Sequence, residues 1–401
     1  MADSGCSVRF PAGPSPIQAM VCAPNRRCAG PGDCGRIAVP TGMCVHPAPR
    51  ELQMAQPFVA LHCILPPYLL ERLAHSADTR VRDLAIRAIA LAAEIRATRA
   101  TLASVPLAAA IPSPAGRRHR LVYDARHGSF QSLPGTLVRA EGARATKDAA
   151  VDEAYTHSGA TYDFYKRVFG RNSLDGRGMS LISSVHLGRR YNNAFWTGQQ
   201  MAYGDGDGSL FVRFTRALDV VGHELTHGVV AHTCNLEYRD EPGALNEHFA
   251  DVMGTLVRQW RRRQDAATAD WRVGADIMGP GARATSLRTF EAGPAFVDDP
   301  WLGTDPQPKH LRDKYRGSDD NGGVHINSGI PNHAFYLAAR ALGGRAWEHA
   351  GRIWYKSMVA LTRTSRFADL VAMTEQVAAA EFGVNGREQQ AVVAAWKAVG
   401  F

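Results

Sequence analysis

Cysteine is almost absent from the last three quarters of this chain of 401 residues. Six of the seven cysteines lie before residue 64, and only Cys234 follows them. The large C-terminal part therefore cannot form an internal disulfide. The spacing of Cys22, Cys28, Cys34 and Cys44 lacks the close pairs of a zinc knuckle. We expect this Pro- and Gly-rich segment to be a poorly ordered leader, with a small disulfide cluster as the alternative.

Long apolar runs are missing as well. No run of about 18 apolar residues occurs, so no transmembrane helix is expected. The first residues, MADSGCSVRFPAGPSP, lack the basic and then apolar pattern of a signal peptide. The formal net charge is +8, but the arginines are mostly scattered, without a basic helix that carries interleaved aromatic residues. We therefore expect neither a membrane nor a nucleic acid as a partner.

Composition divides the chain into four segments. Residues 1–55 form the leader, and 56–118 hold two short helical patterns followed by a linker with prolines and paired arginines. Residues 119–218 contain short apolar runs between Gly, Asn and Asp, typical of strands and turns, with one helix at about 150–169. Residues 219–401 are mainly helical, which indicates an α+β protein with a β-rich half and a helical half. The expected helices there are 217–233, 244–262, 329–343, 346–362, 366–382 and 386–399, with a loop-rich interval at 264–324.

Two histidines lie four residues apart at the junction of these halves, in DVVGHELTHGVVAH. Side chains at this spacing lie one above the other on a helix, so His223 and His227 present two imidazoles to one point. A pair of polar residues facing water is the ordinary alternative. The next motif, GALNEHFAD, places Glu247 twenty residues after His227, enough for a turn and a returning helix. Because catalytic zinc takes three protein ligands and keeps one open position, these three residues predict one zinc ion.

Residues around these ligands carry the remaining chemistry. Asp251 and Asn246 could each accept a hydrogen bond from the non-ligating ring nitrogen of one histidine and so fix its tautomer. Glu224 follows a ligand but points away from the ligand face. It can take a proton from water and pass it to a leaving nitrogen. The pattern predicts metal-assisted hydrolysis.

Several motifs in a fixed order resemble the thermolysin-like zinc metallopeptidases: YNNAFWTGQQMAYGDGDG, HELTH, GALNEHFAD and NGGVHINSGIPNHAFYLA. The resemblance runs from about residue 119 to the C-terminus. It implies a two-domain fold, a β-rich domain and a helical domain with the zinc helix between them, and a monomer that cleaves protein or peptide substrates. Near the front, LPPYLLERLA resembles the short propeptide of the protealysin subgroup. This implies a zymogen that is inhibited by its own propeptide.

The resemblance also implies roles for single residues. His325 and Tyr238 would stabilise the oxyanion of the reaction, and Asp320 would orient His325. Asn193 and Ala194 would bind the substrate backbone as an edge strand does. The side chain of Arg288 would hold a substrate carbonyl. The pocket for the residue after the cleaved bond is apolar, which predicts a large hydrophobic residue there, and its lining would be Phe211, Val220 and Leu287.

The chain departs from the family where thermolysin binds paired calcium ions. Asp219 and Asp270 remain, but Arg258, Arg272 and Ala275 stand where glutamates would be. Calcium needs about six to eight oxygen ligands, several of them charged. We therefore expect the paired calcium site to be absent, with the two aspartates paired to the two arginines instead.

Several questions stay open at this stage. Cys63 could add a thiolate as a fourth zinc ligand, and His248 should point away from the metal and be incidental. The alternative to an active endopeptidase is a catalytically silent relative that binds peptides, although Glu224 and His325 are both present. An aminopeptidase would need an amine-binding motif, which we do not find. The propeptide would be cut within 101–120, and we expect secretion, with a cytoplasmic location as the alternative.

Overall fold

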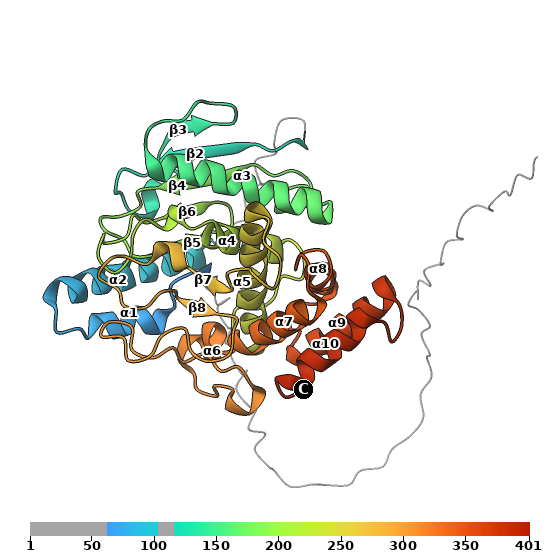
Figure 1. Cartoon of the computed structure of the whole chain (residues 1–401). Coiled ribbons are helices and arrows are strands. Elements are labelled where there is room, and N and C mark those ends of the chain that lie inside the picture. Colours follow the sequence, from blue (N-terminus) through green and yellow to red (C-terminus); the bar gives the residue numbers. More distant parts are fainter. Residues whose placement is uncertain (1–61, 103–115) are drawn as a thin grey trace, which may run out of the picture. The chain divides into compact units, whose positions relative to one another are not determined.

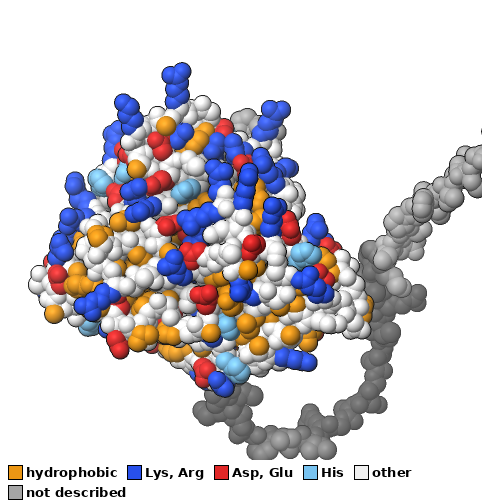
Figure 2. All heavy atoms as spheres, viewed as in Figure 1, with side chains coloured by type: hydrophobic (Ala, Val, Ile, Leu, Met, Phe, Trp, Pro, Cys, Tyr) orange, Lys and Arg blue, Asp and Glu red, His pale blue; other side chains and the backbone are white. Residues whose placement is uncertain are grey.

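A computed structural model of the chain describes residues 62–102 and 116–401. The leader, and most of the linker in which cleavage is expected, lie outside these residues. In the described part, none of the helices is long and apolar enough to cross a membrane. Figure 2 shows Lys and Arg side chains spread over one face, with acidic side chains among them.

A six-stranded mixed sheet forms the β-rich half, with α3 packed against β2 and β4 (Figure 1). Strands β2, β4 and β6 run parallel, and the other pairings are antiparallel. The apolar runs predicted as strands form β2, β4, β5 and β6, whereas LFVRF forms only a bridge at Phe211 and a 3₁₀ turn. In the order of the sheet the strands are β1 (His62–Cys63), β5 (Ala194–Trp196), β6 (Met201–Tyr203), β4 (Leu181–Val185), β2 (Arg120–Asp124) and β3 (Thr136–Ala140), and α3 is Ala149–Phe169.

The helical half begins with α4 (Leu218–Ala231) and α5 (Asp240–Arg262), which pack along each other. The predicted helices all occur, and α5 begins four residues earlier than expected. The interval 264–324 contains a small sheet and one more helix that the sequence did not indicate. These further elements are β7 (Arg272–Val273), β8 (Arg288–Thr289), α6 (Asp319–Asn327), α7 (Gly329–Leu342), α8 (Ala350–Ala360), α9 (Phe367–Phe382) and α10 (Arg387–Ala398).

Glycine sets the distance between α4 and α5. A Cβ added to Gly254 of α5 would lie 2.4 Å from the backbone oxygen of Asp219 and 2.8 Å from the backbone nitrogen of His223. A Cβ added to Gly222 of α4 would lie 3.0 Å from the Cα of Gly254. Such distances leave no room for a side chain, so the two backbones can touch only where both residues are glycine. This contact brings the histidine face of α4 against the acidic face of α5.

The segment that resembles a propeptide folds onto the same unit. Helix α1 (Pro67–Ala74) starts with a proline, which suits the first turn of a helix, and it buries Leu69, Leu70 and Leu73. Helix α2 (Thr79–Leu102) packs against α1 and, with 24 residues, is much longer than predicted. Strand β1 precedes both helices and pairs with β5. The segment therefore adds a strand to the sheet as well as two helices (Figure 1).

A buried ion pair fixes α4 and α5 to the small sheet. The Arg258 side chain is fully buried, and its Nη1 donates to Asp219 Oδ2 at 2.7 Å. The same aspartate oxygen accepts a hydrogen bond from the backbone of Gly274, and Arg258 Nη2 donates to the Asp270 carbonyl. Arg272 pairs with Asp270 at 3.0 Å, nearer the surface. Both pairings expected from the sequence are present.

A histidine ties the start of α3 to the loop after β6. Asp148 caps α3 by accepting hydrogen bonds from two backbone amides, and its Oδ2 is 3.0 Å from His186 Nε2. The other ring nitrogen of His186 contacts Asp205 at 2.9 Å. The hydrogen bond to Asp205, opposed by burial, raises the pKa of His186 to about 9, and Asp148 adds to the rise. The protonated ring thus bridges two carboxylates.

This bridge predicts a dependence of stability on pH. Because the pKa of His186 is raised above its unfolded value, its stabilisation is complete below about pH 6.5 and is lost as the pH rises through about 9. We expect the difference in unfolding free energy between wild type and His186→Gln to be larger at about pH 6 than at about pH 9.5 in urea titrations. His127→Gln is the control, because this more exposed ring lies 3.7 Å from Asp205. A pH-independent difference would contradict the assignment.

Candidate metal centre and active site

Three buried side chains meet between α4 and α5. His223 Nε2 and His227 Nε2 are 3.1 Å apart, and each lies 3.4 Å from one oxygen of Glu247. Two ligands of a tetrahedral zinc ion, each bonded at about 2.0–2.1 Å, are roughly 3.3 Å apart. Oxygen Oε2 of Glu247 is buried and has no hydrogen-bond partner among the described residues. The geometry, the nitrogen and oxygen donors and this unsatisfied oxygen all fit a zinc ion.

Second partners hold both histidines in place. His223 Nδ1 is 2.9 Å from Asp251 Oδ1, and His227 Nδ1 is 2.8 Å from Asn246 Oδ1. With Nδ1 donating to these oxygens, each Nε2 lone pair is directed at the shared point. Although burial alone would raise it, the charge of Arg288 and the contact with His223 hold the pKa of Asp251 well below its usual range. The arrangement is the one that the sequence predicted for both residues.

His248 does point away from the metal site, but it is not incidental. It is fully buried, and its Nδ1 is 2.7 Å from Asn332 Oδ1 of α7. Trp354 of α8 donates to its Nε2 at 2.8 Å, which requires an unprotonated nitrogen there. Burial lowers the pKa of His248 to about 4, so the ring is neutral at physiological pH. Asn332 also donates to Asp251 Oδ2 at 2.9 Å, so His248 supports the ligand His223 through two residues, Asn332 and Asp251.

Glu224 lies beside the ligands with its carboxylate fully buried. Burial, and then the charge of Glu247, raise its pKa well above the usual range. The backbone amides of Ile64 and Trp196 act in the opposite direction, although neither closes a hydrogen bond with the carboxylate. A buried carboxylate has no hydration shell, and its raised pKa makes it a better proton acceptor. Glu224 is therefore suited to act as a general base.

His325 and Tyr238 approach the ligands from the opposite direction. His325 Nε2 is 3.1 Å from the Tyr238 hydroxyl, and that hydroxyl donates to Glu247 Oε1. Asp320 receives hydrogen bonds from both the ring and the backbone of His325, at 2.6 and 2.7 Å. Burial would lower the pKa of His325, but Glu247 and Asp320 outweigh it and raise the pKa to about 9. The Asp320 carboxylate thus holds the ring of His325, as the family resemblance implies.

The residues predicted to hold a substrate backbone contact the segment that resembles a propeptide instead. Asn193 accepts a hydrogen bond from the Leu65 amide at 3.0 Å and donates to the Leu65 carbonyl at 3.3 Å. Arg288 donates to the Ile64 carbonyl at 3.0 Å, and its other nitrogens pair with Asp251. Ala194 accepts from the Ile64 amide at 3.3 Å. The predicted pocket residues share one buried apolar cluster with Ile64, and they are Phe211, Val220 and Leu287.

Cys63 does not act as a fourth ligand in this arrangement. Among the described residues, the group whose ligand atoms all lie within 4.8 Å of one another contains His223, His227 and Glu247 alone. The Cys63 sulfur instead lies 3.4 Å from the Leu65 carbonyl, and burial raises the pKa of its thiol. A protonated thiol is a poor zinc ligand. The carbonyl of Cys63, not its sulfur, is the atom that faces the site.

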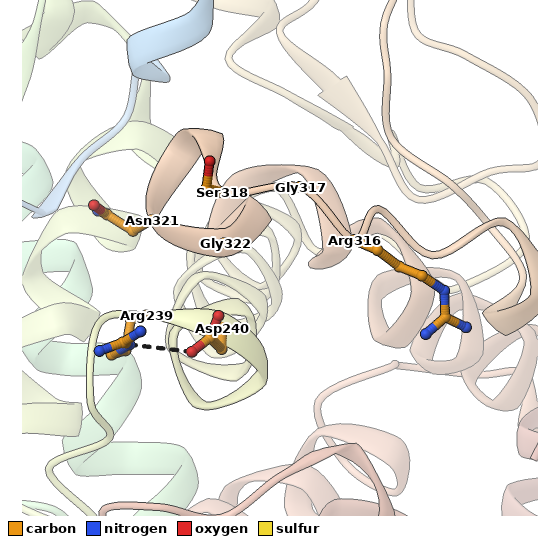
Figure 3. A pocket seen from close by; sticks show the side chains of 7 residues that line it. All are labelled: Arg239, Asp240, Arg316, Gly317, Ser318, Asn321 and Gly322. Atoms are coloured by element: carbon orange, nitrogen blue, oxygen red, sulfur yellow. Dashed lines mark hydrogen bonds and ion pairs between the residues drawn. The ribbon is translucent and has the colours of Figure 1, made fainter.

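A surface hollow of about 440 Å³ opens beside the loops that carry Tyr238 and Asp320 (Figure 3). Arg239 and Asp240 pair on one side of it at 3.1 Å. The side chain of Arg316 points away from this pair in Figure 3. None of the three candidate metal ligands lines this hollow, so it is distinct from the buried metal centre.

The partner of His227 gives a direct test of the metal centre. We expect Asn246→Ala to weaken zinc binding by about 10–100-fold, because His227 loses the acceptor that fixes its ring. Competition with a chromophoric chelator would measure the change. Asn246→Asp is the matched control, since it keeps an acceptor at the same place. Equal affinity of wild type and Asn246→Ala would show that this contact does not orient the ligand.

Comparisons with known proteins agree with this geometry. Residues 115–231 match the thermolysin metallopeptidase catalytic domain, and residues 234–401 match the thermolysin metallopeptidase alpha-helical domain. An extracellular metalloprotease of Pectobacterium carotovorum subsp. carotovorum is 48% identical over 289 residues, which are 72% of this chain and 82% of that protein. A thermolysin of Alicyclobacillus acidocaldarius subsp. acidocaldarius is 43% identical over 69% of this chain and 50% of its own length.

A solved structure resembles the whole described unit. It is the precursor of protealysin, a metalloproteinase from Serratia proteamaculans, with a TM-score of 0.76 and 44% identity. The match covers 84% of this chain and 99% of that one. Together with the family matches and the buried cluster of two histidines and a glutamate, this shows that the chain belongs to the thermolysin metallopeptidase family and is a zinc metalloendopeptidase of protealysin-like architecture.

Proposed function

We propose that His223, His227 and Glu247 hold one zinc ion and that the site cleaves peptide bonds within protein substrates. A zinc ion bound there would lower the pKa of a bound water and polarise the substrate carbonyl. The observation that carries this proposal is the convergence of three buried ligand atoms, with histidines fixed by Asp251 and Asn246.

Side chains of the chain itself supply the proton transfers and the charge stabilisation. Glu224 takes a proton from the attacking water and passes it to the leaving nitrogen, as its raised pKa suits. The charged ring of His325, with the Tyr238 hydroxyl beside it, donates to the oxygen that gains negative charge. A catalytically silent peptide-binding relative is less well supported, because all three groups are in place.

Casein hydrolysis tests this proposal. We expect the activated protein to cleave casein, and a zinc chelator to abolish cleavage until zinc is restored. Glu224→Ala should reduce the rate by about 10²–10⁴-fold, because the general base is lost while the ligands remain. Zinc content, measured in the same samples, is the control for metal binding. Full activity of Glu224→Ala, or activity without zinc, would contradict the proposed mechanism.

We further propose that the chain is made as a zymogen whose propeptide blocks the cleft. Leu65 and Ile64 use the hydrogen-bonding groups of Asn193, Ala194 and Arg288, so a substrate strand cannot bind there at the same time. The edge strand of a sheet recognises an extended peptide in the same way, by pairing with it as an added strand. The protealysin structure that this chain resembles is that of a precursor, which supports the proposal. The buried Ile64 side chain also supports a preference for a hydrophobic residue after the cleaved bond.

The paired calcium site of the family is, we propose, replaced by ion pairs in this chain. The fully buried guanidinium of Arg258 pairs with the Asp219 carboxylate. It thus supplies the positive charge that a bound calcium ion would otherwise supply. The Arg272–Asp270 pair adds a second positive charge nearby. Two fixed guanidinium groups repel a calcium ion from this place.

Stability measurements test the replacement. We expect Arg258→Ala to lower the unfolding free energy by about 3–5 kcal/mol, because it leaves Asp219 buried without its partner. Arg272→Ala, whose side chain is 45% exposed, should cost about 0–1 kcal/mol and serves as the matched control. Neither calcium nor a calcium chelator should shift the melting temperature of the wild type. A shift of several degrees with micromolar calcium would favour a retained site.

Secretion is the location we propose for the mature enzyme. It is supported by the name of the Pectobacterium relative, an extracellular metalloprotease. A protease that acts outside the cell benefits from a propeptide that keeps the cleft closed during synthesis. Sequencing the N-terminus of the protein from culture medium and from cells would test this location, and a mature form confined to cells would contradict it.

A further inference from the structure

Strand β1 enters the site in a fixed register. It runs antiparallel to β5, with His62 opposite Trp196 and Cys63 opposite Phe195. The next residue continues the pattern, because the Ile64 amide donates to the Ala194 carbonyl at 3.3 Å. Asn193 then binds both polar backbone groups of Leu65. The backbone of these four residues is thus held at each step.

The carbonyl end of one peptide bond faces a reactive group. The Cys63 carbonyl oxygen lies 3.0 Å from His325 Nε2, the donor that we assign to the developing oxyanion. The Ile64 nitrogen, at the other end of this bond, donates to the Ala194 carbonyl at 3.3 Å. No other peptide bond of β1 has its oxygen on His325. The following carbonyl, that of Ile64, is held by Arg288.

We propose that the bond between Cys63 and Ile64 occupies the position of the scissile bond, and that the enzyme opens its own cleft by cutting this bond. The inference rests on the proposed function, and it adds a site of regulation to it. It also assigns the neighbouring residues to substrate positions: Cys63 before the cut, Ile64 in the apolar pocket after it, and Leu65 next.

The reaction is an ordinary hydrolysis. The oxygen of one water molecule bonds to the Cys63 carbonyl carbon, and Glu224 accepts a proton from that water. His325 donates to the carbonyl oxygen while it is negatively charged. The bond from carbon to the Ile64 nitrogen then breaks, and Glu224 returns the proton to that nitrogen. The products are a carboxylate at Cys63 and a new amino terminus at Ile64.

Burial explains how the precursor delays this cut. Ile64 and Leu65 are fully buried and Cys63 nearly so, so little water reaches the bond while β1 is seated. Among the described residues, the part before the cut pairs with β5 through His62 and Cys63. That part can leave first, whereas the part after the cut remains attached to α1. Removal of the block would then proceed in two stages.

Mass spectrometry of the full-length chain with zinc tests the proposal. We expect a fragment that begins at Ile64 to accumulate with first-order kinetics at a rate independent of protein concentration. Glu224→Ala should not form it. Ile64→Asp should slow its formation at least 100-fold, because a charge is excluded from a buried apolar pocket, whereas Ile64→Val should retain it. Ile86→Asp, the same change at a 50% exposed position of α2, is the matched control.

The outcomes separate the two proposals. Casein hydrolysis without any terminus at Ile64 would overturn this inference and leave the endopeptidase assignment intact. No casein hydrolysis in any sample would overturn the proposed function and this inference with it. A concentration-dependent rate would show cutting between molecules and would overturn the claim that the seated bond is cut.

A second readout does not require catalysis. In the Glu224→Ala background, Cys63 should be protected from alkylation, because it is buried under the seated strand. Adding Ile64→Asp should speed its alkylation at least tenfold, as measured by peptide mapping, and adding Ile86→Asp should not. Equal protection in both double variants would show that Ile64 does not seat β1, which would overturn the register argument.

Discussion

The contact between α4 and α5 at two glycines is the constraint on which the metal centre depends. Gly222 and Gly254 let the backbones approach until a Cβ on either would collide with the other helix. Only at this distance can a glutamate on α5 reach both histidines on α4. A larger residue would separate the helices, and because packed interiors do not tolerate extra volume, the ligand set would open with them. Glycine here serves catalysis through geometry rather than through flexibility.

Asp251 joins the metal centre to the substrate cleft. One oxygen accepts from His223, and both oxygens pair with Arg288, whose remaining nitrogen holds the Ile64 carbonyl. A fully buried carboxylate is stable only when it is well paired, and this one has three partners, including Asn332. The same charge therefore orients a zinc ligand and fixes the arginine that grips the strand in the cleft.

Helix periodicity explains why the ligands could be predicted. His223 and His227 must share a face wherever α4 forms, and the acidic face of α5 follows the same rule. The long helices of the C-terminal half were predicted within a few residues because each carries a regular apolar pattern. Asp320 and Asn321, in contrast, have a φ of 54°, in a left-handed run that no periodic pattern signals. Helix α6 was therefore missed, although its motif identified His325.

Strand β1 could not be predicted from the sequence, and the open question about Cys63 has the same origin. Two residues give no periodic signal, and the partner of β1 lies more than 130 residues away along the chain. A strand directs successive side chains to opposite faces and its carbonyls sideways to its neighbours. A cysteine that lies near the metal site in space can thus turn its sulfur aside. Only the register decides which atom faces the metal, and long-range pairing sets the register.

The same register explains why one cleft can be both blocked and poised. An inhibitor that merely filled the space would not need its backbone polar groups to meet Asn193, Ala194 and Arg288 one after another. The Ala194 carbonyl and the Arg288 nitrogen that binds the Ile64 carbonyl would lose these partners if an apolar plug replaced the strand, at a cost of about 1–3 kcal/mol each. A strand satisfies them all, but a strand that does so has the geometry of a substrate. In the zymogen that we propose, a tight block of this site would therefore resemble what the enzyme cuts, and exclusion of water by the seated strand would delay the cut.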